Sequence, residues 1–364
     1  MNKNIMCKLT AVILPLLLVA CNGGSSGGED PVPYEEIYEQ GVDRYLGSYA
    51  PMSASVEGNT AAHTFGAGDG PLCLDGSEYT MTTRDLGSTD LVIFLEGGGA
   101  CWSTFCAANE TASAGVPSRG VLDPGLAGNP LAEMNVAYFP YCDGSLFTGD
   151  VDNEYDIREG TEHQRGLKNL SAGLDVVANT FPSPNRIVLA GNSGGALGSI
   201  FALSLVRKIY PDVPIDIIND SGLGLGKDND PDFQTMLFDE WNSVAFLPDS
   251  ICPECLDSGH LTEYFRWQIG QDDNFRLAML TSKQDVVIGS AFLQVGGPAF
   301  EISVIRELAV IEDFAEGRMR SWIADGADHT YVQRDITATA GGVSVLDWLT
   351  DFLDEDEDWS SVSD

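Results

Sequence analysis

The pentapeptide Gly191-Asn192-Ser193-Gly194-Gly195 matches the G-x-S-x-G pattern that displays a nucleophilic serine. It follows the apolar run 187–190 and precedes a helical stretch rich in small residues. A serine on such a strand-to-helix turn points outward at the carboxyl edge of a parallel sheet, and the flanking glycines remove side chains that would clash in the bend. Ser193 is therefore the candidate nucleophile, and an ordinary glycine-serine turn is the alternative interpretation.

A serine nucleophile needs a base that takes up its hydroxyl proton. The sequence has four histidines, of which three lie away from the expected sheet edge: His63, His163 and His260. His329 follows the last strand candidate, 320–324, on a loop at the edge where Ser193 is displayed. This is the place of the base in the serine, acid, histidine order of α/β-hydrolases. We expect His329 to be the base, with a purely structural histidine as the alternative.

Two aspartates compete for the role of the acid that orients the base. Asp285 comes shortly after the strand candidate 276–280, between nucleophile and base in the chain. Asp220 ends the preceding strand candidate, where its other role would be to hold a turn by accepting hydrogen bonds from backbone N–H groups. We favour Asp285 as the acid and keep Asp220 as the alternative.

The run Gly97-Gly98-Gly99 supplies the backbone donors that a developing oxyanion requires. It follows the strand candidate 91–95, and glycines let N–H groups face a ligand without obstruction by side chains. We expect Gly98 and Gly99, together with the N–H of Gly194, to form the oxyanion hole. A phosphate-binding loop is the alternative, but no Gly-Lys-Ser/Thr follows the run.

Apolar runs alternate with amphipathic helical stretches, which is typical of a mostly parallel sheet covered by helices. The strand candidates are residues 91–95, 136–141, 187–190, 215–219, 276–280 and 320–324. The helix candidates are residues 167–178, 196–210, 300–314 and 343–353. The sequence therefore predicts an α/β fold of the α/β-hydrolase type. Its catalytic domain is expected to span 34–353, with a cap-like insertion at about 222–274 and an acidic, solvated tail at 354–364. The aromatic residues of the insertion are expected to form a small core rather than a ligand platform.

The first twenty residues predict a lipoprotein signal peptide. Lys3 and Lys8 give it a basic start, and an apolar run leads to small residues before Cys21. The glycine- and serine-rich stretch 21–33 is expected to be a flexible tether. The pattern indicates acylation of Cys21 and export of a membrane-anchored protein to the outer membrane or cell surface; an ordinary secretory signal is the alternative.

Apart from Cys7 in the signal and Cys21, six cysteines remain, an even number in an oxidising compartment. Disulfides are the default expectation for the loop pairs Cys101 with Cys106 and Cys252 with Cys255, which leaves Cys73 and Cys142 to close a long loop. Zinc is an alternative for the C-x-x-C segment 252–255, but it has no second C-x-x-C and no suitably spaced histidines. We expect no metal and no cofactor.

The chain carries 19 Lys and Arg against 55 Asp and Glu, a net charge of −36. Such a charge excludes binding to the phosphate backbone of nucleic acids as a main role. It also repels itself in dilute buffer, whereas high salt screens the repulsion. The composition therefore predicts a salt-adapted protein whose stability rises with NaCl.

Four segments occur in order along the chain: CLDGS at 73–77, LEGGGACW at 95–102, FPYCDGS at 139–145 and LAGNSGG at 189–195. Together they resemble the pectin acetylesterase and Notum family over roughly residues 71–331. The resemblance implies Ser193 as nucleophile, Asp285 as acid, His329 as base and the N–H groups of Gly98, Gly99 and Gly194 as oxyanion donors. It also implies disulfides Cys73–Cys142 and Cys101–Cys106. Gly194 stands where this family usually has alanine.

The expected activity is that of an exported serine carboxylesterase acting on O-acyl esters. Acetyl groups on an acylated polysaccharide such as pectin are the first expectation for the substrate, although steering of a polyanion by so acidic a protein is unfavourable. One alternative is hydrolysis of long acyl esters of lipids or acylated proteins, which needs an apolar pocket. The other is an inactive, surface-anchored carbohydrate-binding or scaffold protein.

Overall fold

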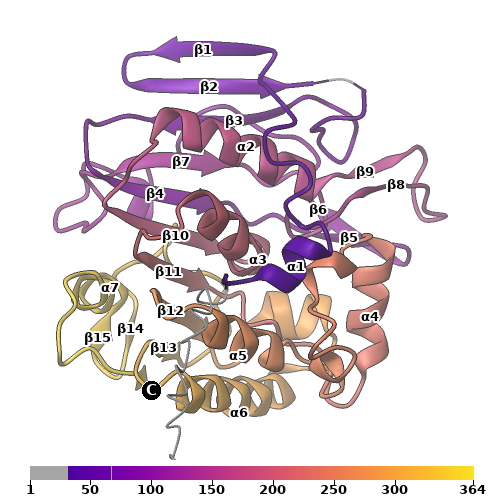
Figure 1. The fold of residues 1–364 in the computed structure, drawn as a ribbon. Coiled ribbons are helices and arrows are strands. Elements are labelled where there is room, and N and C mark those ends of the chain that lie inside the picture. Colours follow the sequence, from indigo (N-terminus) through magenta and orange to yellow (C-terminus); the bar gives the residue numbers. More distant parts are fainter. Residues whose placement is uncertain (1–31, 67) are drawn as a thin grey trace, which may run out of the picture. The chain divides into compact units, whose positions relative to one another are not determined.

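A ten-stranded sheet forms the centre of the fold in the computed structural model, which describes residues 32–66 and 68–364 (Figure 1). The expected signal peptide, Cys21 and nearly all of the expected tether lie outside the described residues. In order across the sheet, the strands are β1 (Ser53–Glu57), β2 (Thr60–Phe65), β3 (Tyr79–Arg84), β7 (Asn135–Phe139), β4 (Asp90–Leu95), β10 (Arg186–Asn192), β11 (Ile215–Asp220), β12 (Phe275–Ser282), β13 (Met319–Ala324) and β16 (Val362–Ser363).

The sheet is antiparallel at one end and parallel elsewhere. Strands β1, β2, β3 and β7 pair in antiparallel fashion, and every pairing from β7 through β4 to β16 is parallel. In the register of the central strands, Gly191 lies opposite Leu95 and Asn192 lies opposite Asp220. The carboxyl ends of β4, β10 and β11 therefore meet at one edge, where the loops that follow them can converge.

Helices and short elements complete the domain (Figure 1). The α-helices are α1 (Glu35–Glu39), α2 (Gly166–Thr180), α3 (Gly194–Ile209), α4 (Pro231–Glu240), α5 (Thr262–Gln271), α6 (Gly297–Phe314) and α7 (Val345–Leu353). Single helical turns and a short π-helix are η1 (Gly120–Leu122), η2 (Val244–Phe246), η3 (Glu254–Leu256) and η4 (Val286–Phe292). The small hairpins are β5 (Gly99–Trp102) with β6 (Phe105–Ala108), β8 (Val151–Asn153) with β9 (Glu162–Gln164), and β14 (Thr339–Ala340) with β15 (Val343–Ser344).

Successive side chains of the central strands point to opposite faces of the sheet and are buried in two separate hydrophobic cores. On β4, Leu91, Ile93 and Leu95 belong to a core shared with α2, α3, α5 and α6, whereas Val92 and Phe94 belong to a core shared with α7. Burial of both faces is why these strands are continuous apolar runs rather than alternating ones. All six predicted strands and all four predicted helices are present, with ends shifted by a few residues. The α/β class is thereby confirmed.

The antiparallel end of the sheet was not predicted. Every residue of β1 is exposed and most of β2 is only half-buried, so neither strand carries the apolar periodicity that marks a core strand. The hairpin of β5 and β6 was also missed because each of its strands has only four residues.

The region 222–274, expected as an irregular cap, contains the helices α4 and α5. Its aromatic residues are divided between two settings. Phe246, Tyr264, Phe265 and Trp267 pack in the main core, as expected for a structural cluster. Trp241 instead packs with Trp102 in a smaller cluster.

The end of the described chain is not a free tail. Residues 354–358 are exposed as expected, but the segment then returns to the sheet, where β16 pairs in parallel with β13. Trp359 is buried against Trp348 and Phe352 of α7. The expected solvated tail is therefore limited to the acidic run itself, because Trp359 after it is buried and residues 362–363 pair with the sheet.

Within residues 32–66 and 68–364 the cysteines form three disulfides: Cys73–Cys142, Cys101–Cys106 and Cys252–Cys255. The last pair is bonded within its own C-x-x-C segment, so its sulfurs are not free to bind zinc. Among the residues that the structure describes, no single helix has the length and apolar character needed to cross a bilayer, although η4 and α6, a pair bent by 119°, meet the length and composition criteria together.

Candidate active site

Ser193 occupies a strained turn between β10 and α3. Its φ is 54°, a left-handed conformation that is uncommon for a residue with a side chain and recurs at functional turns. Its N–H donates to the carbonyl of Asp220 at 2.7 Å, which ties the turn to β11. The flanking glycines are required by space: a Cβ at Gly191 would lie 2.1 Å from the carbonyl oxygen of Gly195, and one at Gly195 would lie 2.1 Å from that of Leu95.

His329 lies on the loop after β13, and its ring faces Asp285. Nδ1 of His329 is 2.6 Å from Oδ2 of Asp285, and the aspartate side chain is only 1% exposed. The other oxygen, Oδ1, accepts hydrogen bonds from the N–H groups of Val287 and Ile288 and so caps η4. With the carboxylate accepting from Nδ1–H, the lone pair of the imidazole is on Nε2, as a general base requires.

Asp220 supports the same loop through its backbone. Its Oδ2 accepts hydrogen bonds from the N–H groups of Tyr331 and Val332, at 2.7 and 2.8 Å. Burial raises the pKa of Asp220 from its ordinary value of 3.8 to about 6, and these two backbone donors oppose the rise. Asp220 therefore has the turn-holding geometry considered as its alternative role, while Asp285 is the aspartate that contacts the ring.

The glycine loop lies against the serine turn. The N–H of Gly97 donates to Oδ1 of Asn192 at 3.0 Å, and a Cβ at Gly97 would lie 2.7 Å from the Cβ of Ser193. Gly99 has a φ of 86°, a conformation that glycine adopts without strain.

The N–H groups of the loop and of α3 remain available as donors. The N–H of Gly98 makes no hydrogen bond within the described residues. The carbonyl of Gly98 accepts from the N–H of Asn109, which makes Gly99 and Ala108 a non-hydrogen-bonded pair whose N–H groups point away from each other. Gly194 is the first residue of α3, so its N–H has no partner within the helix. The three predicted donors therefore lie around Ser193 on backbone that does not use them.

Ser193 and His329 line the same polar cavity, together with Gly98 and Gly99. No hydrogen bond joins the Ser193 hydroxyl to His329 in the described structure, so the structure places both groups in one cavity without the contact that proton transfer needs. Such contacts are often long in a free enzyme and shorten when substrate binds. The roles of Ser193, Asp285 and His329 therefore remain predictions with a consistent arrangement.

Ser193 lies where two cavities of different chemistry meet. The polar cavity contains charged and amide side chains of residues distant in sequence: Glu96, Asn109, Arg119, Gln333 and Arg334. The second cavity is almost wholly apolar, and its walls come from the glycine hairpin, α3, α4 and η4: they include Trp102, Leu197, Phe233, Leu237, Trp241 and Phe292. Gly99, Ser193 and Phe292 line both cavities.

The apolar cavity is the part of the site that the sequence did not reveal. Phe233 and Leu237 lie on α4, a helix that was not predicted, and Phe292 ends η4. Trp102 directly follows Cys101 and comes three residues after Gly99, and this position was the one available signal. Its ring stacks on Phe105 with centroids 4.6 Å apart and meets Phe233 edge-on.

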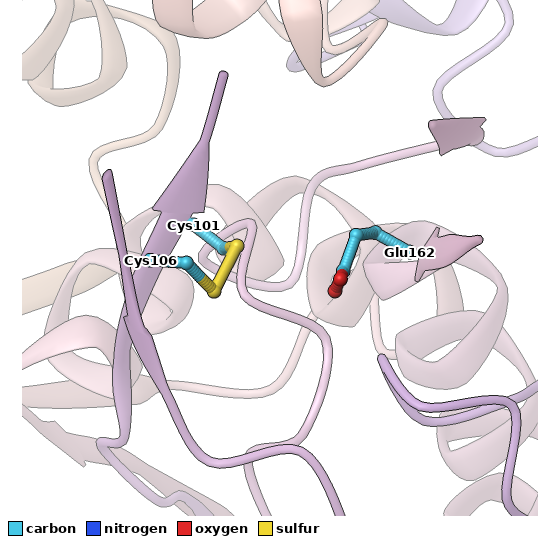
Figure 2. Close-up of side chains that lie close together, drawn as sticks. All are labelled: Cys101, Cys106 and Glu162. Carbon is cyan, nitrogen blue, oxygen red and sulfur yellow. A yellow bond between two sulfur atoms is a disulfide. The ribbon is translucent and has the colours of Figure 1, made fainter. Parts of the chain in front are cut away.

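Only one group of three or more side chains in the described part of the chain has its potential metal-ligand atoms gathered within 4.8 Å: Cys101, Cys106 and Glu162 (Figure 2). The two sulfurs are bonded to each other, so they are not thiolate ligands. Glu162 is held by Arg158, whose Nε lies 2.7 Å from its Oε1. The cluster is therefore a disulfide on the hairpin that carries Gly99, beside an ion pair formed by Glu162 of β9 and Arg158.

The pectinacetylesterase family model matches residues 64–245, which is half of the 364-residue chain. The chain belongs to the pectinacetylesterase family. The matched residues include the glycine loop, Ser193 and the cysteines of two disulfides, but they end before Asp285 and His329. The acid and the base therefore rest on the geometry described above.

Curated relatives agree with the family. Over 168 residues the chain is 29% identical to pectin acetylesterase 4 of Arabidopsis thaliana, covering 42% of this chain and 41% of the relative. It is 25% identical over 164 residues to palmitoleoyl-protein carboxylesterase notum2 of Xenopus laevis, covering 42% of this chain and 33% of the relative. Pectin acetylesterase 11 of Arabidopsis thaliana is 26% identical over 178 residues, with 44% of each chain covered. The chain thus spans less than half the length of these pectinacetylesterase relatives.

Gly194 departs from the family pattern without blocking the site. A Cβ at this position would lie 3.2 Å from the carbonyl oxygen of Gly99 and 3.2 Å from a methyl group of Leu146. Those contacts are tight but can be relieved by a small shift, in contrast to the 2.1 Å backbone contact at Gly195. The alanine usual in the family would therefore narrow the junction of the two cavities, and glycine widens it.

Proposed function

We propose that this protein is a serine carboxylesterase in which Ser193 is the nucleophile, His329 the general base and Asp285 the residue that orients the base. One observation carries the proposal. A strained serine turn and a histidine held at 2.6 Å by a buried aspartate line one cavity, beside backbone donors that the fold leaves unused. The names of the curated relatives, two pectin acetylesterases and a palmitoleoyl-protein carboxylesterase, support the ester class.

The reaction follows from the positions of these groups. Oγ of Ser193 attacks the acyl carbon of the ester while Nε2 of His329 takes the hydroxyl proton, and the positive imidazole is stabilised by Asp285. His329 then gives the proton to the oxygen of the departing alcohol. In the second half, water attacks the acyl-enzyme and passes a proton to Nε2 of His329. The histidine then gives this proton to Oγ of Ser193 as the bond from Oγ to the acyl carbon breaks, which frees the acid and restores the hydroxyl.

The N–H groups of Gly98, Gly99 and Gly194 stabilise the negative oxygen of both tetrahedral intermediates. Removing one donor of this kind typically costs about 3 kcal/mol of transition-state stabilisation. Gly98 and Gly99 lie on a loop that is fixed by Asn192 on one side and by the disulfide hairpin on the other, and Gly194 is the first residue of α3. They need no reorganisation when the charge forms, which is the property that makes an oxyanion hole effective.

The two cavities divide the ester between them. The apolar cavity receives the acyl group, and the polar cavity, with Arg119, Arg334 and Asn109, receives the alcohol. A polar cavity of this composition suits a hydroxyl-rich alcohol such as a carbohydrate. An apolar cavity lined by Trp102, Phe233 and other bulky side chains is larger than an acetyl group needs, so the geometry favours larger acyl groups over acetyl.

Two measurements on separate samples test the proposal. One is covalent labelling with a fluorophosphonate, and the other is hydrolysis of p-nitrophenyl acetate, butyrate and palmitate by unlabelled protein. We expect labelling of the wild type, loss of labelling and turnover in Ser193→Ala and His329→Ala, and no loss in Ser55→Ala, which changes an exposed serine on β1. A folded wild type that is neither labelled nor active would instead support the inactive scaffold. The chain-length profile separates acetyl from larger acyl groups.

We also propose export and lipid anchoring through Cys21, supported by the signal-like sequence and by three disulfides. Detergent phase partitioning of the protein expressed in a bacterium with lipoprotein processing tests this step. The wild type is expected in the detergent phase and Cys21→Ser in the aqueous phase. Equal partitioning of the two would contradict the anchor while leaving the esterase proposal intact.

A further inference from the structure

Gln234 is a polar residue in the wall of the apolar cavity. It lies on α4, is 6% exposed, and lines the same cavity as Ser193. Its amide makes no hydrogen bond with any residue in the ranges 32–66 and 68–364, and the amide atoms are not among those fully enclosed by protein. The amide therefore has donors and an acceptor that no protein group uses, on a side chain that lines the cavity.

The other polar groups of the wall have partners, which makes Gln234 exceptional. The hydroxyl of Thr148 donates to the carbonyl of Ser145 at 2.7 Å. The indole N–H groups of Trp102 and Trp241 donate to Thr104 and to the carbonyl of Cys101. Of the polar side chains that line the apolar cavity, Ser193 and Gln234 alone have no hydrogen bond within the described residues.

An amide in such a position has a cost. A buried polar group without a partner destabilises a fold, and such groups in native proteins usually have a specific explanation. The backbone leaves room for this one: a Cβ at Gly226 would lie 2.9 Å from Nε2 of Gln234 and 2.1 Å from the carbonyl oxygen of Gly259. A leucine or methionine would fill the same space without the cost, so the amide points to a bound partner.

The remaining wall constrains the shape of that partner. Several of its members are aromatic: Trp102, Phe201, Phe233, Phe238, Trp241 and Phe292. Aromatic walls favour a flat ring, which gains from stacked and edge-on contacts in addition to burial. A partner that reaches from Ser193 to Gln234 must be apolar along its body and must carry a hydrogen-bonding group away from the ester.

We propose that the acyl group of the natural ester is a hydroxylated aromatic acid, whose ring lies in the apolar cavity and whose hydroxyl is bound by the amide of Gln234. The inference rests on the proposed esterase function and adds to it a substrate class. The same chemistry explains why the cavity is apolar yet retains one amide. It also assigns Gln234 as a specificity-determining residue, because Gln234 contacts the acyl group away from the reacting carbon.

Matched pairs of methyl esters test the proposal: benzoate, phenylacetate and cinnamate, each with and without a 4-hydroxyl group. The three acids differ in the distance between the ester carbon and the 4-hydroxyl group. For one of them we expect the hydroxyl to raise kcat/KM about tenfold in the wild type, because it forms a hydrogen bond with the buried amide of Gln234. Gln234→Met is expected to abolish this preference, measured as the ratio of kcat/KM for the hydroxylated ester to kcat/KM for its unhydroxylated partner, whatever the absolute activity of the variant. Gln271→Met, on the exposed end of α5, is expected to leave this ratio unchanged.

A second readout does not depend on turnover. Because the amide has no partner among the described protein groups, Gln234→Met is expected to melt at the same temperature as the wild type or higher. Equal kcat/KM values within all three pairs would overturn the inference, and so would a hydroxyl preference that survives in Gln234→Met. The inference would also be overturned if methyl palmitate were hydrolysed faster than every one of the aromatic methyl esters. If the folded wild type hydrolyses acetate but shows no preference, only this inference fails; if it hydrolyses no ester, the proposed function fails as well.

Discussion

Two buried aspartates at the carboxyl edge of the sheet hold the loop of His329 in different ways. Asp285 contacts the imidazole with one oxygen and caps η4 with the other. Asp220, the last residue of the neighbouring strand β11, accepts hydrogen bonds from the backbone just after the histidine. Both residues are aspartates, and both lie at the same edge of the sheet. Their roles differ because one acts on the ring and the other on the chain that carries it.

The largest expected effect is that of Asp285. Asp285→Ala is expected to lower kcat by about 10⁴-fold, because the imidazolium loses its counter-ion and the ring loses its orientation. The measurement is turnover of p-nitrophenyl acetate. Asp285→Asn serves as the control for capping, since asparagine also caps helices. A similar loss in both variants assigns the effect to the ring, whereas nearly normal turnover in Asp285→Asn would contradict that role.

A smaller effect on turnover and a larger one on stability are expected for Asp220. Asp220→Ala leaves two buried N–H groups without an acceptor, which should lower the free energy of unfolding by about 2 kcal/mol or more. Because the loop of His329 loses only part of its support, kcat should fall by about 10- to 100-fold. Urea unfolding and turnover measure the two quantities. If Asp220→Ala abolishes turnover and Asp285→Ala does not, the assignment of the acid is wrong.

The pH dependence of stability separates the two aspartates further. The pKa of Asp220 is about 6 in the folded protein and 3.8 as its ordinary value, so between these values the native state holds a proton that the unfolded chain has released. The contribution of Asp220 to the free energy of unfolding is therefore fully present below about pH 4 and decreases as the pH rises towards 6. The difference in unfolding free energy between wild type and Asp220→Asn should shrink across this range. A difference that is constant from pH 4 to 6 would refute the raised pKa.

The smallest effect expected is that of salt, which acts on exposed carboxylates and little on these buried ones. With a net charge of −36, the melting temperature should rise with NaCl as the repulsion among surface carboxylates is screened. The ratio of turnover between wild type and Asp285→Ala should stay the same, since the contact with His329 is shielded from solvent. A melting temperature that is flat or falls with NaCl would argue against salt adaptation.

The sequence predicted the parts of the site that depend on local backbone. The turn around Ser193 has no room for side chains at 191 and 195, and this requirement for glycine produces the recognisable G-x-S-x-G pattern. His329 was predicted as the base by elimination, because the chain has few histidines and only this one follows a strand at the right edge; the structure shows its contact with Asp285, and its role as base stays a prediction. The six core strands were found because burial on both faces makes them continuous apolar runs.

Other parts of the site depend on which way a side chain faces, and the sequence left these open. Asp220 and Asp285 both follow strands in the right order, and only the fold shows which of them reaches the imidazole. The apolar cavity was hidden because its walls come from α4, η4 and the hairpin around Trp102, segments too short or too irregular to show a pattern. Gln234 carries no sequence signal at all, since its meaning comes only from the apolar residues around it.

The hairpin of β5 and β6 also has a consequence for when the enzyme becomes competent. Gly99 begins β5, two residues before a cysteine whose disulfide to Cys106 joins the two strands. The carbonyl of Cys101 is itself held at 2.7 Å by the side chains of Gln164 and Trp241. Polypeptide made in a reducing cytosol therefore lacks the covalent bond that joins the two strands beside the proposed oxyanion hole. We expect the reduced protein to be inactive as an esterase until the disulfide forms, so that ester hydrolysis begins only in a compartment where thiols are oxidised.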